Sequence, residues 1–221
     1  MYKYDTHLHT MQASFCANVP GKFQAEAYKE AGYDGIIITD HFFRGNTCIS
    51  RELPWEERIN QFYSGYEDAK KRGDEIGIKV FFGWEETYAG TDFLIYGLDK
   101  EWLLEHPECE YWTIQEQYQE VSAAGGLVVH AHPFRKRDYI PKIRLFPNLI
   151  HAVEVYNAGN DEEENRRALT YAQQYDLPMT SGSDNHTAHV LCSGVATNKP
   201  LNSIQDYINL IKYGSDYNLI Y

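Results

Sequence analysis

Apolar runs alternate with amphipathic stretches along most of the chain, and each change of period predicts a new element of secondary structure. The expected strands are Tyr2–His9, Gly35–Thr39, Lys79–Trp84, Asp92–Tyr96, Leu127–Val129, His151–Tyr156, Leu177–Gly182 and Gly194–Thr197. The expected helices are Pro20–Ala31, Trp55–Ile76, Thr113–Ala124, Asp161–Tyr175 and Ile204–Tyr213, and the segment Glu101–Tyr111 is expected to be irregular. Strands that alternate with helices over this length favour an α/β fold with parallel strands. No linker or repeat interrupts the pattern, so residues 1–221 are expected to form a single domain.

Polar residues of metal-binding types gather where the expected strands end. His7 and His9 lie two apart in a strand, so their imidazoles point to the same side, as a chelating pair requires. Similar residues follow other strands: Asp40 and His41, Glu85, His130 and His132, and Asp184 and His186. Functional groups from many strand ends that meet at one face are typical of a TIM-like barrel. An open doubly wound sheet would favour a glycine-rich phosphate loop, and the sequence has none.

The histidines test this interpretation, because six of the nine belong to these strand-end clusters. Any single one could instead be a hydrogen-bonded core or surface residue, but all six together with the acids indicate a metal site. Mixed imidazole and carboxylate ligands suit Zn, Mn or Fe. A carboxylate such as Glu85 could bridge two cations, and a metal-bound hydroxide would then be the nucleophile. No Gly-x-Ser-x-Gly motif offers a covalent alternative.

An ordered set of short motifs resembles the PHP (polymerase and histidinol phosphatase) family. The motifs are His7-Leu8-His9, Thr39-Asp40-His41, Gly83-Trp84-Glu85, His132-Pro133 and Gly182-Ser183-Asp184-Asn185-His186. The resemblance extends from residue 5 to about residue 197. It implies a distorted (β/α)7 TIM-like barrel with two or three divalent metal ions at the C-terminal ends of the strands. It also implies hydrolysis of phosphate esters.

The resemblance carries ligand roles onto particular positions. It implies that His7, His9, Glu85 and Asp184 hold one metal, and that Glu85 bridges to a second metal bound by His132. The fourth strand often supplies a further histidine in this family, and here the matching residue is Asp92.

A third metal would be faced by His41 and His186. The family often adds a histidine shortly after the first pair, but this chain has Met11–Cys16 there. His41 and His186 could therefore be partial ligands or, with Asp184, could handle protons in catalysis. His130 could chelate together with His132 or support the ligands from behind.

Other residues are expected to assist the metals or the substrate. A phosphate contact is predicted for Arg135, which follows His132 closely, and for Arg44, because guanidinium binds phosphate through paired hydrogen bonds. Lys136 and Arg137 are expected to be solvated. Supporting roles behind the ligands are expected for three residues: Asp40, Glu154 and Asn157. Glu154 could alternatively face solvent, and Asn157 could merely shape a turn.

Charge and cysteine content narrow the partners. A formal net charge of −12 opposes binding to long nucleic acids and anionic membranes. No apolar stretch reaches the roughly 20 residues that span a bilayer, and the N-terminus lacks a signal-peptide pattern, so a cytoplasmic location is expected. The cysteines form no Cys-x-x-Cys pair and are expected to be free thiols. The oligomeric state is left open.

The sequence therefore predicts a metal-dependent hydrolase of phosphate esters. Its substrate would be a small phosphorylated metabolite or a nucleotide, and it would act as a phosphatase or phosphodiesterase. Two alternatives stay open: an amidohydrolase-type C–N bond hydrolase on the same metal site, and a non-catalytic metal-binding scaffold.

Overall fold

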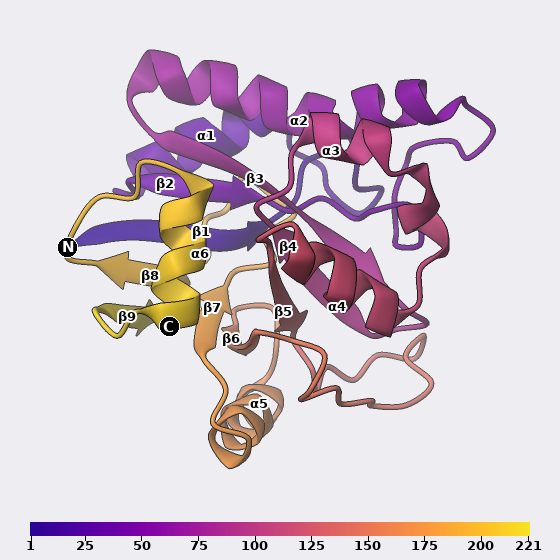
Figure 1. Cartoon of the computed structure of the whole chain (residues 1–221). Coiled ribbons are helices and arrows are strands. Elements are labelled where there is room, and N and C mark those ends of the chain that lie inside the picture. Colours follow the sequence, from indigo (N-terminus) through magenta and orange to yellow (C-terminus); the bar gives the residue numbers. More distant parts are fainter.

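The computed structural model describes every residue from Met1 to Tyr221, and strands and helices alternate along the chain (Figure 1). The strands are β1 (Tyr2–Leu8), β2 (Gly35–Ile38), β3 (Lys79–Thr87), β4 (Asp92–Tyr96), β5 (Leu127–Ala131), β6 (Ala152–Asn157), β7 (Met179–Gly182), β8 (Gly194–Thr197) and β9 (Tyr217–Ile220). The helices are α1 (Gly21–Glu30), α2 (Trp55–Ile76), α3 (Lys100–Glu105), the 3-10 helix η1 (Pro107–Tyr111), α4 (Ile114–Ala123), α5 (Glu162–Gln174) and α6 (Ile204–Tyr213).

One sheet contains all the strands, in the order β7-β6-β5-β4-β3-β2-β1-β8-β9. It curls until the residues that follow β7 meet the end of β1. There the Asp184 N–H donates to the His7 carbonyl at 2.7 Å, and the His9 N–H donates to the Asn185 carbonyl at 2.9 Å. The first half of β1 pairs instead with β8, antiparallel, from Tyr2 opposite Thr197. The seven strands β1 to β7 therefore form a nearly closed barrel, which confirms the expected distorted (β/α)7 architecture.

The expectation of parallel strands is wrong for β4, which runs antiparallel to both β3 and β5. The cause is the short connection before it: parallel strands need a crossover of a dozen or more residues, whereas this turn is a tight hairpin. Ala89 and Gly90 have φ angles of 47° and 79°, as the two central residues of a type I′ turn require. Because β4 is reversed, its first residue, Asp92, lies at the rim where the parallel strands end.

The C-terminal and central segments also differ from expectation. The stretch expected to be irregular contains α3 and η1, and α3 begins where the Asp99 carboxylate accepts a hydrogen bond from the Trp102 N–H. Strand β9 pairs antiparallel with β8 and was not predicted, because its short sequence carries no clear alternation. Asp161, the residue before α5, forms a capping box with Glu164 in the first turn, so these two acids stabilise the helix N-terminus.

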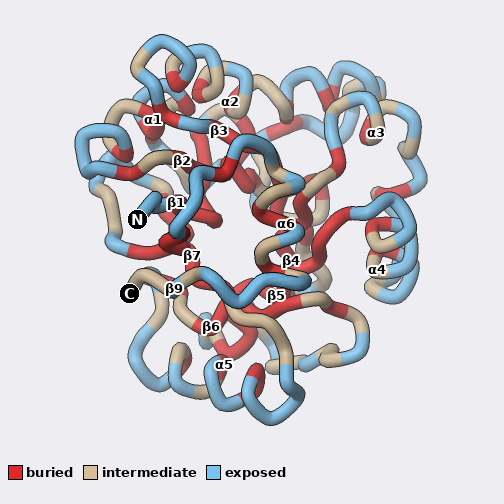
Figure 2. Tube along the Cα trace, turned by 60° about the vertical axis from the view of Figure 1, so that its left-hand side comes forward, coloured by how far each residue is buried: buried red, intermediate tan, exposed pale blue.

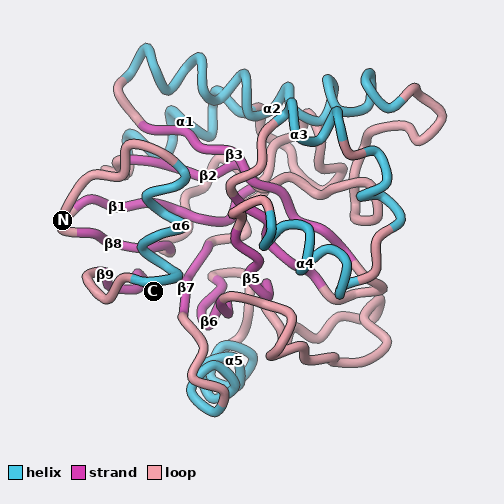
Figure 3. Tube along the Cα trace, viewed as in Figure 1, coloured by secondary structure: helices cyan, strands magenta, loops and turns pink.

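Helices cover the outside of the barrel, with α1 and α2 over one side, α4 over another and α5 over a third (Figure 3). The buried stretches, red in Figure 2, gather on the strands and on the inward turns of the helices. Helix α6 contributes Tyr207, Ile208 and Ile211 to the cluster that fills the barrel interior, together with Tyr96 and Leu127. Those last two residues lie at the end of β4 and the start of β5, so α6 closes the end opposite the strand-end clusters. No helix of the chain is both long enough and apolar enough to cross a bilayer.

Candidate metal centre

The strand ends bring histidines and acids into three groups whose nitrogen and oxygen atoms lie within 4.8 Å of one another. The groups are His7, Glu85 and His132; His7, His9 and Asp184; and His9, His41 and His186. The side chains come from β1, β3 and the residues just beyond β2, β5 and β7. Residues more than a hundred positions apart therefore converge at one mouth of the barrel, as the sequence predicted.

Glu85 lies at the centre of the arrangement. Its Oε1 is 2.9 Å from His132 Nε2 and 3.6 Å from His7 Nε2. Its Oε2 is 2.6 Å from His41 Nδ1 and 3.7 Å from His9 Nε2. One carboxylate thus faces four imidazoles through two oxygens, which is the placement of a bridging ligand.

Two candidate ligands have unusual backbone conformations. His132 has a φ of 28° and Asp184 a φ of 54°, both in the left-handed region that non-glycine residues rarely adopt. Hydrogen bonds hold these turns, because the His132 N–H donates to Glu154 at 3.0 Å and the Asp184 N–H donates to the His7 carbonyl. The turn at His132 swings its ring toward Glu85.

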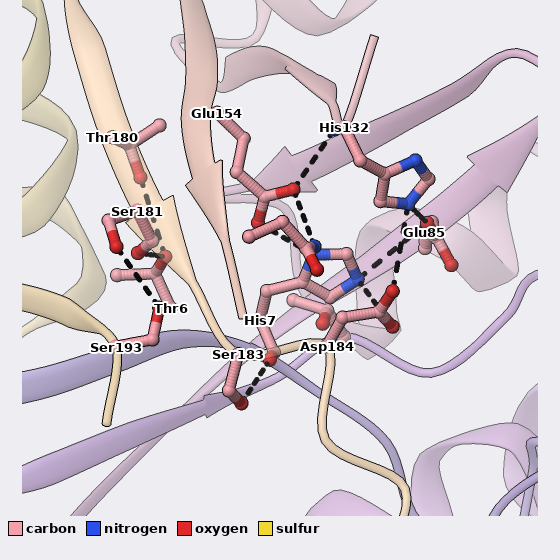
Figure 4. Close-up of polar contacts among 12 residues, drawn as sticks. Thr6, His7, Glu85, His132, Glu154, Thr180, Ser181, Ser183, Asp184 and Ser193 are labelled. Atoms are coloured by element: carbon pink, nitrogen blue, oxygen red, sulfur yellow. Dashed lines mark hydrogen bonds and ion pairs between the residues drawn. The ribbon is translucent and has the colours of Figure 1, made fainter. Parts of the chain in front are cut away.

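The outer nitrogens of the first histidine pair are both held. His7 Nδ1 lies 2.8 Å from Glu154 Oε1, and His9 Nδ1 lies 3.0 Å from the Ser14 hydroxyl (Figure 4 shows the His7–Glu154 contact). If Nδ1 of each ring donates, both Nε2 atoms present lone pairs, and these atoms lie only 3.2 Å apart. Asp184 Oδ1 faces them at 3.4 Å and 3.0 Å. Two lone pairs and a carboxylate aimed at one point are the pattern that a bound cation satisfies.

The three residues expected to support the ligands lie within hydrogen-bond distance of the candidate ligands or of a residue that contacts them. The Glu154 carboxylate contacts His7 and also accepts a hydrogen bond from Asn157 Nδ2 at 2.9 Å, so both residues face the site rather than solvent. Gly182 permits this packing, because a Cβ there would lie 2.5 Å from both Glu154 Oε1 and His7 Cβ. Asp40 contacts the site through Ser14. It accepts a hydrogen bond of 2.7 Å from the Ser14 hydroxyl, and the same hydroxyl contacts His9.

Ser14 itself was missed by the sequence analysis. Its hydroxyl links Asp40 to His9 and also accepts a hydrogen bond from the His41 N–H at 3.0 Å. A serine in a loop carries no spacing signal in a single sequence, so no pattern could have found it.

Electrostatics set the protonation of the cluster. Burial raises the pKa of Glu85, but the facing histidines, above all His41, hold it well below its usual range. Burial also raises the pKa of Asp184, and the charges of Arg135 and His7 more than reverse the effect. For His9, burial and then its neighbour His186 lower the pKa well below 6.5, which favours the neutral imidazole that binds metals.

The donor set fits divalent cations. Glu85 Oε2 and His41 Nδ1 form a buried ion pair at 2.6 Å, and His9 Nε2 faces the same oxygen at 3.7 Å. The three groups thus offer imidazole nitrogens and carboxylate oxygens, the mixed donors that Zn, Mn or Fe accept.

The cluster forms the floor of a cleft of about 660 Å³, with Cys16, Tyr139 and Arg135 on its walls. Arg135 is anchored by three side chains: Asp184 Oδ2 at 2.5 Å, Asn157 Oδ1 at 2.8 Å and Asn160 Oδ1 at 2.8 Å. Its guanidinium is therefore fixed beside the ligands and faces the cleft.

Arg44 lines the same cleft, but its donors are already engaged. Its Nε donates to Glu86 at 3.0 Å, and its two amino groups donate to the Trp112 carbonyl at 2.6 Å and to the Tyr88 hydroxyl at 2.8 Å. The guanidinium also packs on the Tyr88 ring, 4.0 Å from its centroid. Arg44 is thus ion-paired with the buried Glu86 at the cleft wall, and its predicted phosphate contact stays a prediction.

His130 does not reach the cluster, and the prediction that it chelates with His132 is wrong. Its ring stacks on Phe93 with centroids 5.0 Å apart, in the apolar layer outside the barrel, and neither ring nitrogen has a partner. The rule that strand residues two apart share a face fails here, because β5 ends at Ala131 and His132 adopts a positive φ.

Asp92 lies at the edge of the cleft. Its Oδ2 is 4.0 Å from His132 Nδ1, on the side of the ring away from Glu85, and it belongs to none of the three groups. It is therefore placed to orient His132, and a ligand role stays a prediction.

All four cysteines are free, as expected. Cys16 is the one on the cleft wall, beside His41 and His186. Partial burial raises the pKa of its thiol, but the neighbouring imidazoles of His186 and His41 outweigh this and lower it to about 6.

Comparisons with known proteins agree with this geometry. A family model described as PHP-associated matches residues 162–214, which include α5 and α6. An uncharacterized protein of Methanocaldococcus jannaschii is 32% identical over 229 residues, a span that covers 97% of this chain and 81% of the relative.

Two solved structures share the fold. One is a two-domain protein from Bacteroides vulgatus that contains a predicted PHP-like metal-dependent phosphoesterase, with a TM-score of 0.68 and 15% identity. The match covers 96% of this chain but only 63% of that one, so the chain spans less than two thirds of it. The other is an amidohydrolase from Chromobacterium violaceum with bound sulfate and no metal, with a TM-score of 0.53, 14% identity, and coverage of 84% and 88% of the two chains.

Proposed function

The chain belongs to the PHP family, and from that premise we propose that it is a metal-dependent hydrolase of phosphate esters. One observation carries the proposal: four imidazoles face the two oxygens of Glu85 at the mouth of the barrel, with Asp184 beside them. Substrates of the proposed enzyme are small phosphorylated metabolites or nucleotides, and long nucleic acids are disfavoured by the net charge of −12.

The proposed ligand sets follow the three groups. His7, His9, Glu85 and Asp184 would hold one divalent ion, and Glu85 with His132 would hold a second, with Asp92 at its edge. His41 and His186 would face a third. Zinc, manganese and iron all suit such mixed nitrogen and oxygen ligands. Bound there, the ions would polarise a phosphate ester and activate a water molecule for attack.

The chain's own residues supply binding and proton transfer. Arg135 is held rigidly beside Asp184, so its positive charge can stabilise the negative charge that develops on a phosphoryl group. His41 and His186 lie on the open side of the cluster, 16% and 24% exposed, where a proton can reach solvent. Asp184, His186 and His41 are therefore the proposed groups that accept or donate protons during the reaction.

A second candidate is hydrolysis of a C–N bond on the same metal site. The likeness of the fold to that of an amidohydrolase favours it, although at 14% identity that likeness concerns the fold alone. The fixed guanidinium of Arg135 argues for phosphate, because an amide substrate gains less from a cation at that place. A scaffold without activity is the third possibility, and it needs no such anchored arginine.

The test is a phosphate-release screen over a panel of phosphorylated metabolites with Mn, Zn or Fe supplied, run beside a panel of amides and cyclic amidines. Arg135→Ala is expected to lower kcat/KM for phosphate esters by about 10²-fold while metal content stays unchanged. The matched control is Arg137→Ala, because Arg137 lies outside the cleft and contacts Glu164 on α5. Equal activity of the two variants, or turnover of amides alone, would overturn the proposal.

A further inference from the structure

A buried carboxyl group lies just before the first histidine pair and belongs to none of the three groups. Asp5 is 0% exposed, and its hydrogen-bond donors are all neutral: two backbone N–H groups and one phenol hydroxyl. Burying a carboxyl group costs free energy that only its hydrogen bonds offset. What these bonds hold in place is therefore the question that Asp5 raises.

The Asp5 carboxylate joins the two chain segments that supply candidate ligands. Its Oδ1 accepts hydrogen bonds from the His7 N–H at 3.2 Å and from the Ser183 N–H at 3.1 Å. The Ser183 hydroxyl donates to the His7 carbonyl at 3.0 Å, and Figure 4 shows these two residues side by side. The Asp184 N–H donates to the same carbonyl at 2.7 Å. The end of β1 is thus bound to the turn that follows β7.

Regular strand pairing does not join these segments. Strand β1 pairs with β2 and β8, whereas β7 pairs with β6. Between β1 and the turn after β7 there is an isolated bridge, from Leu8 to Asn185. We call this junction the seam of the barrel. Side chains must therefore help to close the seam, at the place where His7 Nε2 and Asp184 Oδ1 face each other at 3.4 Å.

Tyr28, on α1, completes the arrangement from outside the sheet. It is 0% exposed, and its hydroxyl donates to Asp5 Oδ2 at 2.7 Å. The same hydroxyl lies 2.9 Å from Ser183 Oγ, and Asn185 Nδ2 donates to it at 3.3 Å. One phenol therefore contacts both segments of the seam, and it fixes the carboxylate so that Oδ1 faces the two N–H groups.

A neighbouring tyrosine makes equally good hydrogen bonds elsewhere. The Tyr33 ring lies edge-on to the Tyr28 ring, with centroids 5.0 Å apart, and is also buried. Its hydroxyl donates to the Ser193 carbonyl at 2.8 Å and accepts from the Ser193 N–H at 3.1 Å. Ser193 lies just before β8 and is no candidate ligand, so Tyr33 is a matched control for Tyr28.

We infer that Asp5 and Tyr28 are positioning residues of the metal centre, which hold the backbones of His7 and Asp184 together across the seam before any ion binds. The inference rests on the metal site of the proposed function and adds two residues that have no ligand role in it. Both act through backbone groups and Ser183, because neither contacts the imidazole of His7 or the carboxylate of Asp184. A site held in this way binds a cation without first having to order its own ligands.

The first measurement is metal affinity by competition with a chelator, made on full-length Tyr28→Phe and Tyr33→Phe. Each variant loses one buried hydroxyl, so the metal-free proteins should lose similar amounts of stability. Only Tyr28→Phe is expected to bind metal more weakly, by about 10-fold. Asp5→Asn, whose amide oxygen still accepts the two N–H bonds, should retain more affinity than Asp5→Ala.

The second measurement needs neither metal nor turnover. Hydrogen exchange of the metal-free protein, resolved by NMR, should be faster at the His7 and Ser183 amides in Tyr28→Phe and unchanged there in Tyr33→Phe. Wild-type exchange and wild-type metal affinity in Tyr28→Phe, or equal changes in both variants, would overturn the inference. Protein that binds metal with the expected differences but releases no phosphate would refute the proposed activity and support the positioning role.

Discussion

Two histidines at the end of β5 experience opposite environments. His132 turns into the cleft, where Glu85 faces its Nε2 at 2.9 Å, and His130 turns into the outer apolar layer against Phe93. Both are buried, and they are separated in sequence only by Ala131. The difference shows that burial near a strand end does not identify a ligand. The distinguishing features are acids that face the ring and a second nitrogen or backbone contact that fixes it.

The strongest way to sharpen this contrast is to remove the acid at the centre of the cleft. Glu85→Gln keeps the size of the side chain but removes the charge that four imidazoles face. We expect loss of bound metal and a fall in phosphate-ester turnover beyond the roughly 10–100-fold that loss of an orienting partner causes. Metal analysis by plasma mass spectrometry and initial rates at saturating metal measure both effects. Wild-type metal content in this variant would contradict the bridging role.

A smaller effect on metal affinity is expected from a substitution of Glu154, which contacts the candidate ligand His7. Glu154→Gln weakens the hold on His7 Nδ1 without removing a ligand, so metal affinity should fall by about 10–100-fold and added metal should restore turnover. The control is Glu163→Gln, an exposed acid on α5 that pairs only with Arg166. Identical metal affinities for the two variants would show that Glu154 does not orient His7.

The smallest effect on metal content, together with a gain in stability, is expected for a substitution of His130 in the apolar layer outside the barrel. His130→Phe removes two buried nitrogens that lack partners, so the free energy of unfolding at neutral pH should rise by about 1 kcal/mol with metal content unchanged. The same substitution two residues on, His132→Phe, should abolish one metal equivalent. Loss of metal in His130→Phe would break the comparison.

The pH dependence of stability gives a second measurement on the same variant. Burial, with smaller contributions from His132 and Arg144, lowers the pKa of His130 from 6.5 to about 3. A base with a lowered pKa in the folded state stabilises the fold above its unfolded pKa, and this contribution is lost as the pH falls from 6.5 toward 3. Denaturant titrations from neutral to acidic pH should therefore show a smaller acid-induced loss of stability for His130→Phe than for the wild type.

Much of the candidate site could be predicted from the sequence because its candidate ligands follow apolar strands directly. His7, Glu85 and Asp184 each come at or just after such a run, and parallel strands bring their ends to one face. The errors arise where local backbone geometry overrides that pattern. The positive φ of His132 separates it from His130, and a tight hairpin at Ala89 reverses β4.

Long-range partners were also beyond the sequence. Arg44 was expected to bind phosphate, and its contacts with Glu86 and Tyr88 were not predicted, because only the folded chain brings these groups together. Ser14 reaches His9 because its loop folds back over the end of β1. Hydrogen bonds between such residues depend on packing, which neither periodicity nor spacing records.

Anomalous diffraction from crystals grown with zinc or manganese, combined with metal analysis of the same protein, tests the central claim most directly. The account predicts at least two ions within bonding distance of Glu85, one between His7, His9 and Asp184 and the other beside His132. Protein that binds no stoichiometric metal while these side chains still face one another, or ions bound only elsewhere on the surface, would contradict it.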